Sequence, residues 1–225
     1  MTDQIAPDDA LPNLVLIGAM KCGTSALHRY LDLHPEITMS RPKELNFFFG
    51  PANHHTWTAG NRSRGLRWYA RHFPAHASVR GESSPGYTSP DHPGVAERMA
   101  ATIPAARLIY LVRDPIVRAL SHYRHHHAEG DERRPLAAAL FDPASQYISR
   151  GRYHERLLPF TAHFGRRQIL VVAQEDLRDR RAAVLRTRYA AVGRRFAFSR
   201  PPPCPASAPR LQLPLVRWRP RARFR

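Results

Sequence analysis

The stretch LVLIGAMKCGTSALHRYL, residues 14–31, decides the fold of this chain. It opens with four large apolar residues and a glycine, a pattern typical of a buried strand that ends in a turn. Apolar residues then recur at helical spacing until His34-Pro35 stops the pattern. A strand, a glycine turn and a helix start surround an anion with backbone N–H groups and the positive end of a helix dipole. The stretch therefore predicts a phosphate-binding loop.

The residue types in this loop suit an anion. Gly18 and Gly23 allow a tight backbone path, Thr24 and Ser25 supply hydroxyls or a helix cap, and Lys21 supplies a positive charge. In a Walker loop the lysine directly follows the last glycine, whereas here Lys21 precedes Gly23. We therefore expect the phosphate to be held differently than in an ATPase. A simple helix N-cap made by Gly-Thr-Ser remains the alternative explanation.

Strand-like and helix-like segments alternate along the rest of the chain, which favours an α/β fold with a central parallel sheet flanked by helices in three layers. Apolar runs predict further strands over 36–40, 79–83, 106–112 and 168–177. Helical patterns cover 95–104, 116–130 and 146–165, and residues 51–78 resemble an irregular, aromatic-bearing helical insert. We expect one domain over residues 1–190, followed by an Arg/Pro-rich tail over 191–225.

The charge of the chain is concentrated at its end. The formal net charge is +17 over 225 residues, and from Arg178 onward 14 arginines face one acidic residue, Asp179. The polar, acidic N-terminus does not resemble a signal peptide, and no apolar run is long enough to span a membrane. Two cysteines, Cys22 and Cys204, form no disulfide framework. We therefore expect a cytoplasmic location.

A second motif makes the phosphate loop more specific. The segment LIYLVRDPIVRALSHY, residues 108–123, is a strand, then Arg-Asp-Pro, then a helix with Ser121 eight residues after Arg113. Together the two motifs resemble those of sulfotransferases that use 3′-phosphoadenosine 5′-phosphosulfate (PAPS). RPKELNFF and GESSPGYTSP resemble loops of the carbohydrate, heparan-sulfate-type branch, and the likeness covers residues 12–190.

The resemblance implies roles for individual residues. The 5′-phosphosulfate would lie on the loop residues Lys21, Cys22, Gly23, Thr24 and Ser25, with Lys21 also neutralising charge on the leaving oxygen. The 3′-phosphate would lie on Arg113 and Ser121, since a guanidinium can donate two parallel hydrogen bonds to a phosphate. The reaction is an in-line transfer that depends on positioning and charge, with no metal required.

The acceptor side of the site is implied by the two intervening loops. Glu44 is the expected general base, and the alternative is a solvated acid beside Lys43. Lys43, Glu82, Ser83 and Tyr87 are the expected acceptor-side residues, although members of the family often have lysine where this chain has Ser83. The acceptor would be a carbohydrate or glycolipid, but the motifs leave other hydroxyl or amine acceptors open. We expect Asp114 to cap the helix that follows it.

Three features of the sequence stand apart from this interpretation. The run HYRHHHAEGD, residues 122–131, invites a metal site, but consecutive histidines would spread around a helix and no second ligand group has zinc spacing. The basic, glycine-containing cofactor loop that the family carries after its EDL strand is not recognisable, so activity is expected to be impaired. We interpret residues 191–225 as disordered or frameshifted.

Two other functions remain as alternatives. The first is a nucleotide kinase or other NTP-using enzyme on the same fold, which the missing Walker lysine disfavours. The second is a nucleic-acid binder that acts through the arginines of the tail, although no feature suggests base-specific recognition.

Overall fold

The computed structural model describes residues 10–50, 60–180 and 184. The predicted tail over 191–225 and the first part of the predicted insert, 51–59, lie outside the described residues. Within them, five strands form one parallel sheet in the order β2-β3-β1-β4-β5. The strands are β1 (Leu14–Gly18), β2 (Ile37–Met39), β3 (Val79–Ser83), β4 (Arg107–Val112) and β5 (Ile169–Ala173).

Strand β1 occupies the centre of the sheet because its side chains can be buried on both faces. All five of its residues are buried, and Leu14 is paired with Gly81 of β3 on one side and Arg107 of β4 on the other. Continuous apolar runs of this kind are expected in parallel sheets that helices cover on both faces.

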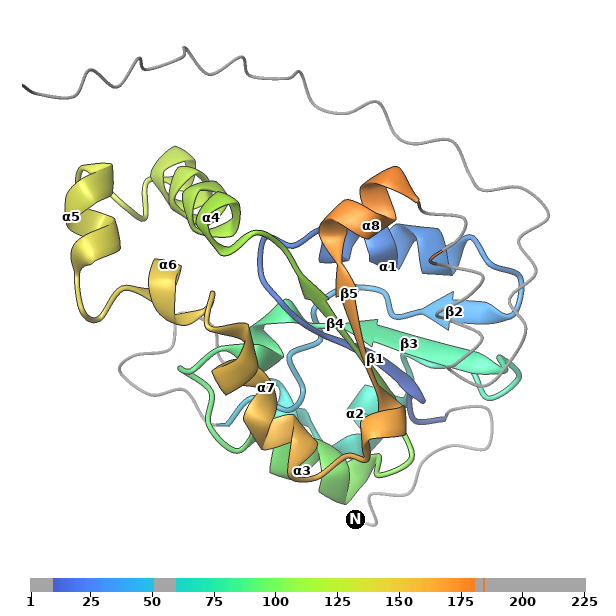
Figure 1. Ribbon diagram of the computed structural model, residues 1–225. Coiled ribbons are helices and arrows are strands. Elements are labelled where there is room, and N and C mark those ends of the chain that lie inside the picture. The colour runs from blue at the N-terminus through green and yellow to red at the C-terminus, as the bar shows by residue number, and fades with distance from the viewer. Residues whose placement is uncertain (1–9, 51–59, 181–183, 185–225) are drawn as a thin grey trace, which may run out of the picture.

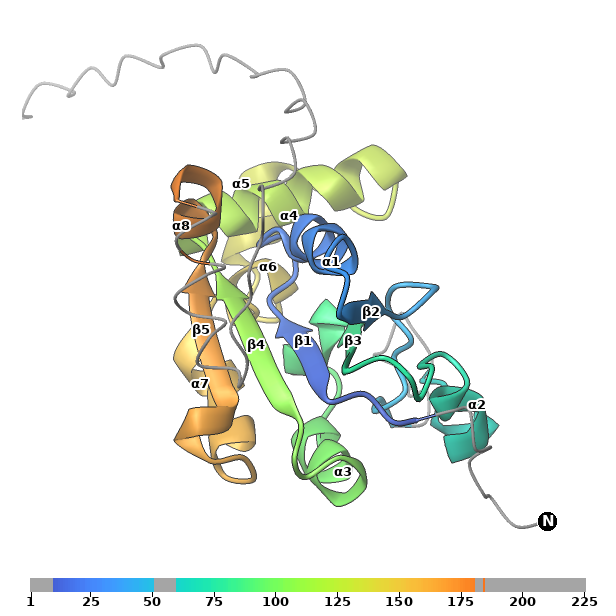
Figure 2. The same ribbon diagram turned by 90° about the vertical axis from the view of Figure 1, so that its right-hand side faces the viewer.

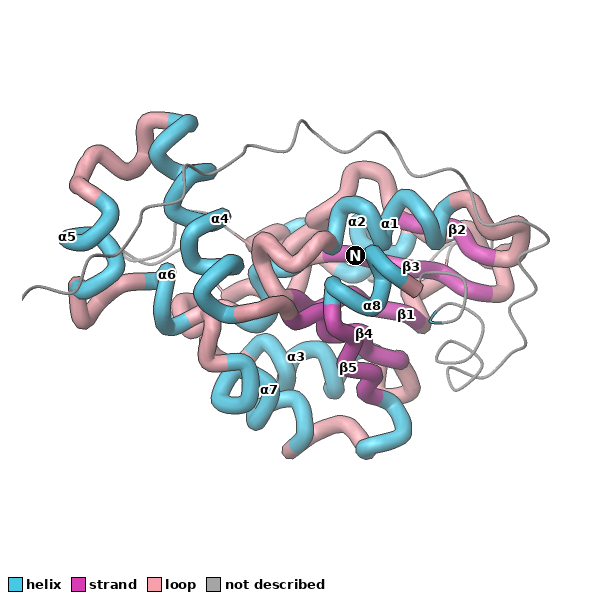
Figure 3. The backbone as a smooth tube through the Cα atoms, turned by 45° about the horizontal axis from the view of Figure 1, so that its top comes forward, coloured by secondary structure: helices cyan, strands magenta, loops and turns pink. Residues whose placement is uncertain are grey.

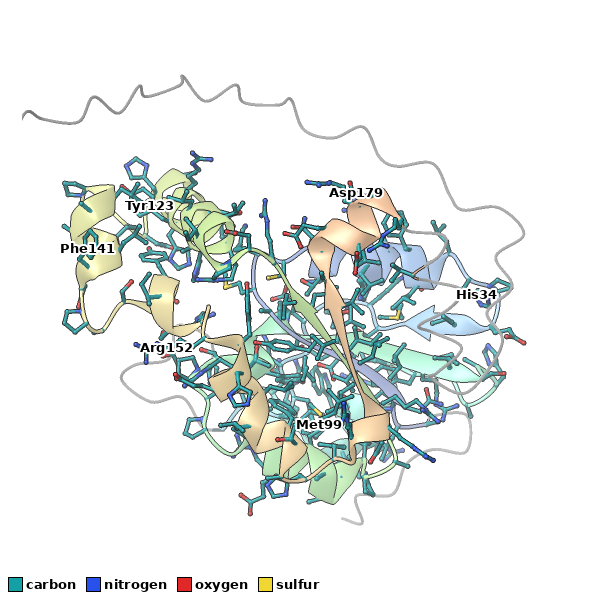
Figure 4. The ribbon with its side chains drawn as sticks, viewed as in Figure 1. His34, Met99, Tyr123, Phe141, Arg152 and Asp179 are labelled. Carbon is teal, nitrogen blue, oxygen red and sulfur yellow. The ribbon has the colours of Figure 1, made fainter. Side chains whose placement is uncertain are left out.

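Helices cover the two faces of the sheet (Figures 1 and 2). On one face lie α1 (Thr24–Asp32) and α8 (Gln174–Asp179), and on the other lie α3 (Val95–Thr102) and α7 (Tyr153–Thr161). Met99 of α3 is fully buried beneath the sheet (Figure 4). The predicted three-layer α/β architecture is thereby confirmed. The short helix α2 (Leu66–Ala70) follows a single 3₁₀ turn at Arg62–Arg64, within the predicted irregular insert.

A small lobe extends beyond the carboxyl ends of the strands (Figure 3). It contains α4 (Pro115–Glu129), α5 (Leu136–Phe141) and α6 (Gln146–Ser149). Tyr123 and Phe141 lie in this lobe, and the Phe141 side chain is largely exposed (Figure 4). The lobe and the sheet meet at the carboxyl edge, where ligands bind in open α/β folds.

Two expectations about the elements were wrong. Residues 146–165 form two helices instead of one, because the chain turns at Gly151 to pass over the buried guanidinium of Arg118. A side chain at Gly151 would meet Arg118 Nε at 3.5 Å and the Ile148 carbonyl oxygen at 3.2 Å. The predicted strand over 168–177 ends at Ala173, and α8 begins at Gln174. Helix α5 was not anticipated.

Candidate functional site

The phosphate loop connects β1 to α1 at the carboxyl edge of the sheet. Lys21 and Gly23 have left-handed φ angles of 66° and 91°, and the Cys22 N–H donates to the Ala19 carbonyl oxygen at 3.2 Å. The N-cap residue is Gly23, which has no side chain to accept from the N–H groups of the first turn. The N–H groups of the first turn therefore remain available to an anion. The alternative of a simple Gly-Thr-Ser N-cap is met in that Gly23 is the N-cap residue of α1.

The two hydroxyl residues of the loop differ in their exposure to solvent. Thr24 is buried and Ser25 is exposed at the start of α1, and Cys22 below them is fully buried. Gln174, the first residue of α8, lies against the loop, since a Cβ at Gly23 would be 3.3 Å from its Cγ. Burial lowers the pKa of Lys21, and the nearby Glu129 carboxylate opposes this shift.

The Arg-Asp-Pro segment lies beside the phosphate loop because β1 and β4 are neighbours. The Arg113 Nη1 donates to the Lys21 carbonyl oxygen at 3.5 Å, so the two predicted cofactor residues are in contact. Asp114 caps α4 as predicted, accepting from the Val117 N–H at 2.8 Å. Ser121 is half-buried almost two turns into α4.

The loop that carries Glu44 is anchored by aromatic side chains. Phe47, Phe48 and Phe49 are buried, and the Phe47 ring stacks on Tyr69 with centroids 4.1 Å apart. The Glu44 N–H donates to the Ser83 carbonyl oxygen at 2.9 Å, which fixes the loop to the end of β3. The Glu44 side chain is exposed and forms an ion pair with Lys43.

Glu44 lines a cavity of about 340 Å³ next to the phosphate loop. Met20, the residue before Lys21, lines the same cavity. The other walls come from the loop that carries Glu44, the segment after β3, the carboxyl end of α4 and the segment 146–150. Its remaining lining residues are Asn46, Phe49, Pro85, Gly86, Asp91, His92, His125, His126, Glu129, Asp131, Gln146 and Arg150.

The other acceptor-side candidates have different surroundings. Lys43 lies beside Glu44, but Glu82, Ser83 and Tyr87 are almost completely buried. Three hydroxyls donate to the Glu82 carboxylate: Ser84 at 2.7 Å, Tyr87 at 2.5 Å, and Tyr69. Burial raises the pKa of Glu82, and the three hydroxyls oppose this shift.

Glu82, Ser83 and Tyr87 therefore expose almost none of their surface in this structure. Ser83 instead contacts the His28 Nδ1 at 3.0 Å through its hydroxyl. The Tyr87 hydroxyl also accepts from the Phe48 N–H at 3.4 Å. These residues hold the loop that carries Glu44, because the Phe48 N–H donates to the Tyr87 hydroxyl and the Glu44 N–H donates to the Ser83 carbonyl oxygen.

Several residues of the site were missed by the sequence analysis. Arg150 and Asp91 form an ion pair at 2.8 Å in the cavity wall, and the Arg150 Nη1 is 3.1 Å from the Met20 sulfur. The Tyr153 hydroxyl lies between the phosphate loop and Arg113. Arg150 and Tyr153 lie within the expected 146–165 helix, and neither has a local signal, because their partners are distant in sequence.

The histidine run does not form a cluster of metal ligands. His125 and His126 line the cavity, while His122 is fully buried beside Arg118. Among residues 10–50, 60–180 and 184, no three His, Cys, Asp or Glu residues are grouped to hold a metal. In the same part of the chain, no helix has the length and hydropathy needed to cross a bilayer.

The fold and this site define the class, a parallel α/β protein with a cavity beside the turn between β1 and α1, and comparison with known proteins specifies the family. The family model described as "Sulfotransferase family" matches residues 12–197. This chain belongs to the sulfotransferase family, which confirms the resemblance noted in the sequence. The match covers the phosphate loop, the Glu44 loop and the Arg-Asp-Pro segment.

Individual relatives agree with this assignment. A bifunctional heparan sulfate N-deacetylase/N-sulfotransferase 1 of Caenorhabditis elegans is 30% identical over an alignment of 192 positions that covers 78% of this chain and 21% of that protein. This chain therefore spans about a fifth of the length of that relative. A crystal structure of a sulfotransferase from Alicyclobacillus acidocaldarius is 30% identical with a TM-score of 0.73, covering 84% of this chain and 83% of the other.

A more distant neighbour supports the fold alone. The mouse sulfotransferase SULT7A1, complexed with PAP, is 17% identical with a TM-score of 0.58. The similarity covers 85% of this chain and 62% of the mouse chain.

Proposed function

We propose that this sulfotransferase moves a sulfuryl group from PAPS to a hydroxyl or amine of a carbohydrate or glycolipid acceptor, with Glu44 as the general base. One observation carries the proposal: Glu44 and Met20, the neighbour of Lys21, line the same cavity of about 340 Å³. A base and a phosphate loop on one cavity are the arrangement that an in-line transfer requires.

The residues present fit the cofactor. An uncapped helix start, a half-buried lysine and an adjacent arginine are complementary to two phosphate groups. The 5′ end would lie on Lys21 and on the N–H groups of Gly23, Thr24 and Ser25, and the 3′-phosphate on Arg113 and Ser121. When bound, PAPS supplies the sulfuryl group and leaves as the bisphosphate PAP. The mouse neighbour, described as a complex with PAP, is consistent with this choice.

The chain's own residues would do three things. Glu44 would take the proton of the acceptor group as that group attacks, and Lys21 would neutralise charge on the departing phosphate oxygen. Lys43, paired with Glu44, would hold its carboxylate at the cavity edge. Glu82, Ser83 and Tyr87 would act indirectly, by supporting the loop that carries Glu44.

The cavity chemistry favours a polar acceptor. Its walls offer amide, imidazole and carboxylate groups from Asn46, Gln146, His126 and Asp91, which can form hydrogen bonds to several hydroxyls. The Caenorhabditis elegans relative is named for sulfating heparan sulfate at nitrogen. We therefore propose a sugar hydroxyl or amine as the acceptor group. A cytoplasmic location and the absence of a metal requirement remain predictions.

A calorimetric titration of adenosine 3′,5′-bisphosphate into the full chain tests the cofactor. Without Mg²⁺ and at ~0.15 M salt, we expect one saturable site that is lost in Lys21→Ala and in Arg113→Ala. Arg166→Ala, a change of an arginine remote from the cavity, is the control and should leave binding unchanged. Binding of ATP only with Mg²⁺, and none of the bisphosphate, would favour the kinase alternative.

Deletion of residues 199–225 tests the remaining alternative, a nucleic-acid binder that acts through the tail. The family model ends at residue 197, so we expect the shortened protein to keep bisphosphate binding. A nucleic-acid binder acting through the arginines of the tail would instead lose its nucleic-acid affinity on deletion and keep it in Lys21→Ala.

A further inference from the structure

The two halves of the proposed cofactor site are joined inside the protein. The phosphate loop follows β1 and Arg113 follows β4, and these strands are paired along their length. The Ala19 N–H donates to the Leu111 carbonyl oxygen at 2.7 Å, and the Arg113 side chain reaches the Lys21 carbonyl oxygen at 3.5 Å. Each half would bind one phosphate, so their relative position sets how well a single ligand fits both.

A third segment, α7, fixes this relative position through one hydroxyl. The Tyr153 hydroxyl donates to the Arg113 carbonyl oxygen at 2.8 Å and accepts from the Arg113 N–H at 3.3 Å. It also lies 3.6 Å from the Cys22 sulfur in the phosphate loop. The residues that this hydroxyl connects are 40 and 131 positions away in the sequence.

The protonation states of Cys22 and Tyr153 agree with the hydrogen bonds that connect them to Arg113. Burial raises the pKa values of both the Cys22 thiol and the Tyr153 phenol, so both groups keep their protons at neutral pH. The thiol can then donate to the phenol oxygen, and the phenol donates to the Arg113 carbonyl oxygen. The Tyr153 hydroxyl is therefore the group that both accepts, from the Arg113 N–H and the thiol, and donates, to the Arg113 carbonyl oxygen.

The ring of Tyr153 is held independently of its hydroxyl. It packs edge-on against Tyr110 of β4, with ring centroids 6.0 Å apart and an interplanar angle of 78°. Tyr110 is almost completely buried. Removal of the hydroxyl alone should therefore leave the ring in place and break only the connection.

We propose that Tyr153 is a positioning residue that couples the 5′-phosphosulfate half of the cofactor site to the 3′-phosphate half. This inference rests on the proposed function, because it assumes that one ligand occupies both halves. The hydroxyl holds the Arg113 backbone and the phosphate loop at a fixed separation before the ligand arrives. Such preorganisation favours a ligand with both phosphates over ligands with one.

The experiment compares four ligands by calorimetry with the full chain: adenosine, its 5′-monophosphate, its 3′-monophosphate and its 3′,5′-bisphosphate. In the wild type, each phosphate should strengthen binding more when the other is present. In Tyr153→Phe we expect bisphosphate affinity to fall about five- to tenfold, on the order of one net hydrogen bond. The affinities of the two monophosphates should change less than about twofold, because each uses one half of the site.

Two further variants show whether the effect is specific to the Tyr153 hydroxyl. Tyr123→Phe is the matched control, because its hydroxyl also donates to a backbone carbonyl oxygen, that of Arg134 at 2.8 Å. Cys22→Ala removes only the thiol arm and should lower bisphosphate affinity less than Tyr153→Phe does. Thermal unfolding of each variant checks that the fold persists.

The outcomes separate this inference from the proposed function. An equal loss for all four ligands in Tyr153→Phe, or no loss for the bisphosphate, would overturn the coupling role and leave the cofactor assignment standing. A wild-type protein that does not bind the bisphosphate would overturn the proposed function, and the inference with it.

Discussion

Glu44 combines two properties that the proposed general base would need. Its backbone is pinned to β3 through the Ser83 carbonyl oxygen, and its side chain remains exposed at the cavity. A φ angle of 68° places it in the left-handed region, which residues other than glycine rarely adopt. The residue is therefore held by its backbone and accessible at its carboxylate.

Glu44→Gln should abolish most turnover and leave cofactor binding intact. The amide is nearly the same size but cannot take the acceptor's proton, so we expect kcat to fall about 10²- to 10⁴-fold. The affinity for adenosine 3′,5′-bisphosphate should stay within about twofold. Steady-state kinetics with PAPS and calorimetry check the two quantities separately.

Glu155→Gln is a suitable control, because Glu155 lies exposed on α7 and pairs with Arg152 and Arg156. It should leave kcat unchanged. A Glu44→Gln enzyme with wild-type kcat would assign the proton transfer to a different group.

At the scale of the element, helices α1 and α4 differ in whether a side chain caps their first turn. Asp114 caps α4 with its side chain, so the backbone donor at Val117 is already used. Helix α1 begins at Gly23 without a side-chain cap. The two helix starts lie after neighbouring strands, yet the side-chain cap that uses a first-turn N–H is present at α4 and absent at α1.

Asp114→Ala should destabilise the protein by about 1 kcal/mol, the usual effect of losing an N-cap. Urea unfolding would measure the change in the free energy of unfolding. Asp114→Asn keeps an acceptor oxygen for the Val117 N–H, so it should retain most of the stability. Equal stability of the Ala variant and the wild type would contradict a capping role.

At the scale of the whole molecule, two basic side chains are buried between the lobe and the sheet. Arg118 and His122 of α4 are fully buried, and the Arg118 Nη1 lies 3.4 Å from the His122 Nδ1. Burial first, and then nearby charges including Arg150, lower the pKa of His122 to about 2. His122 is therefore neutral in the folded protein, whereas in the unfolded chain it binds a proton below about 6.5.

This difference makes stability fall in acid. Because the pKa is lowered on folding, the contribution of His122 is complete above about pH 6.5 and declines as the pH falls from there toward about 2. Between pH 7.0 and 5.5 we expect the wild type to lose about 1 kcal/mol more unfolding free energy than His122→Gln. Urea unfolding at both pH values would measure this.

Some pH dependence should remain in His122→Gln. The pKa values of four other histidines are also lowered by burial: His28, His34, His92 and His126. Identical pH dependence in the wild type and His122→Gln would mean that His122 does not change protonation on unfolding.

The sequence by itself determined the parallel α/β fold and the two strand-to-helix junctions of the site. The segments 14–31 and 108–123 carry local signals: apolar runs, glycines, Asp114 as a cap and helical spacing. Such signals act over a few residues, so the succession of strands and helices along the chain and the position of Lys21 and Arg113 after strand ends follow from them. The assignment to sulfotransferases rested on the same two segments and was confirmed by the family match.

Only the tertiary structure decided which polar residues face the cavity and which support it. Glu82 lies within GESSPGYTSP, the segment that resembles an acceptor-side loop, but the hydroxyls of Tyr69, Ser84 and Tyr87 enclose it in the core. Tyr153 connects Arg113 to Cys22 because α7 packs against β4, a contact that no local pattern specifies. Burial and hydrogen bonding between distant segments depend on how the whole chain packs, and a linear pattern does not contain that information.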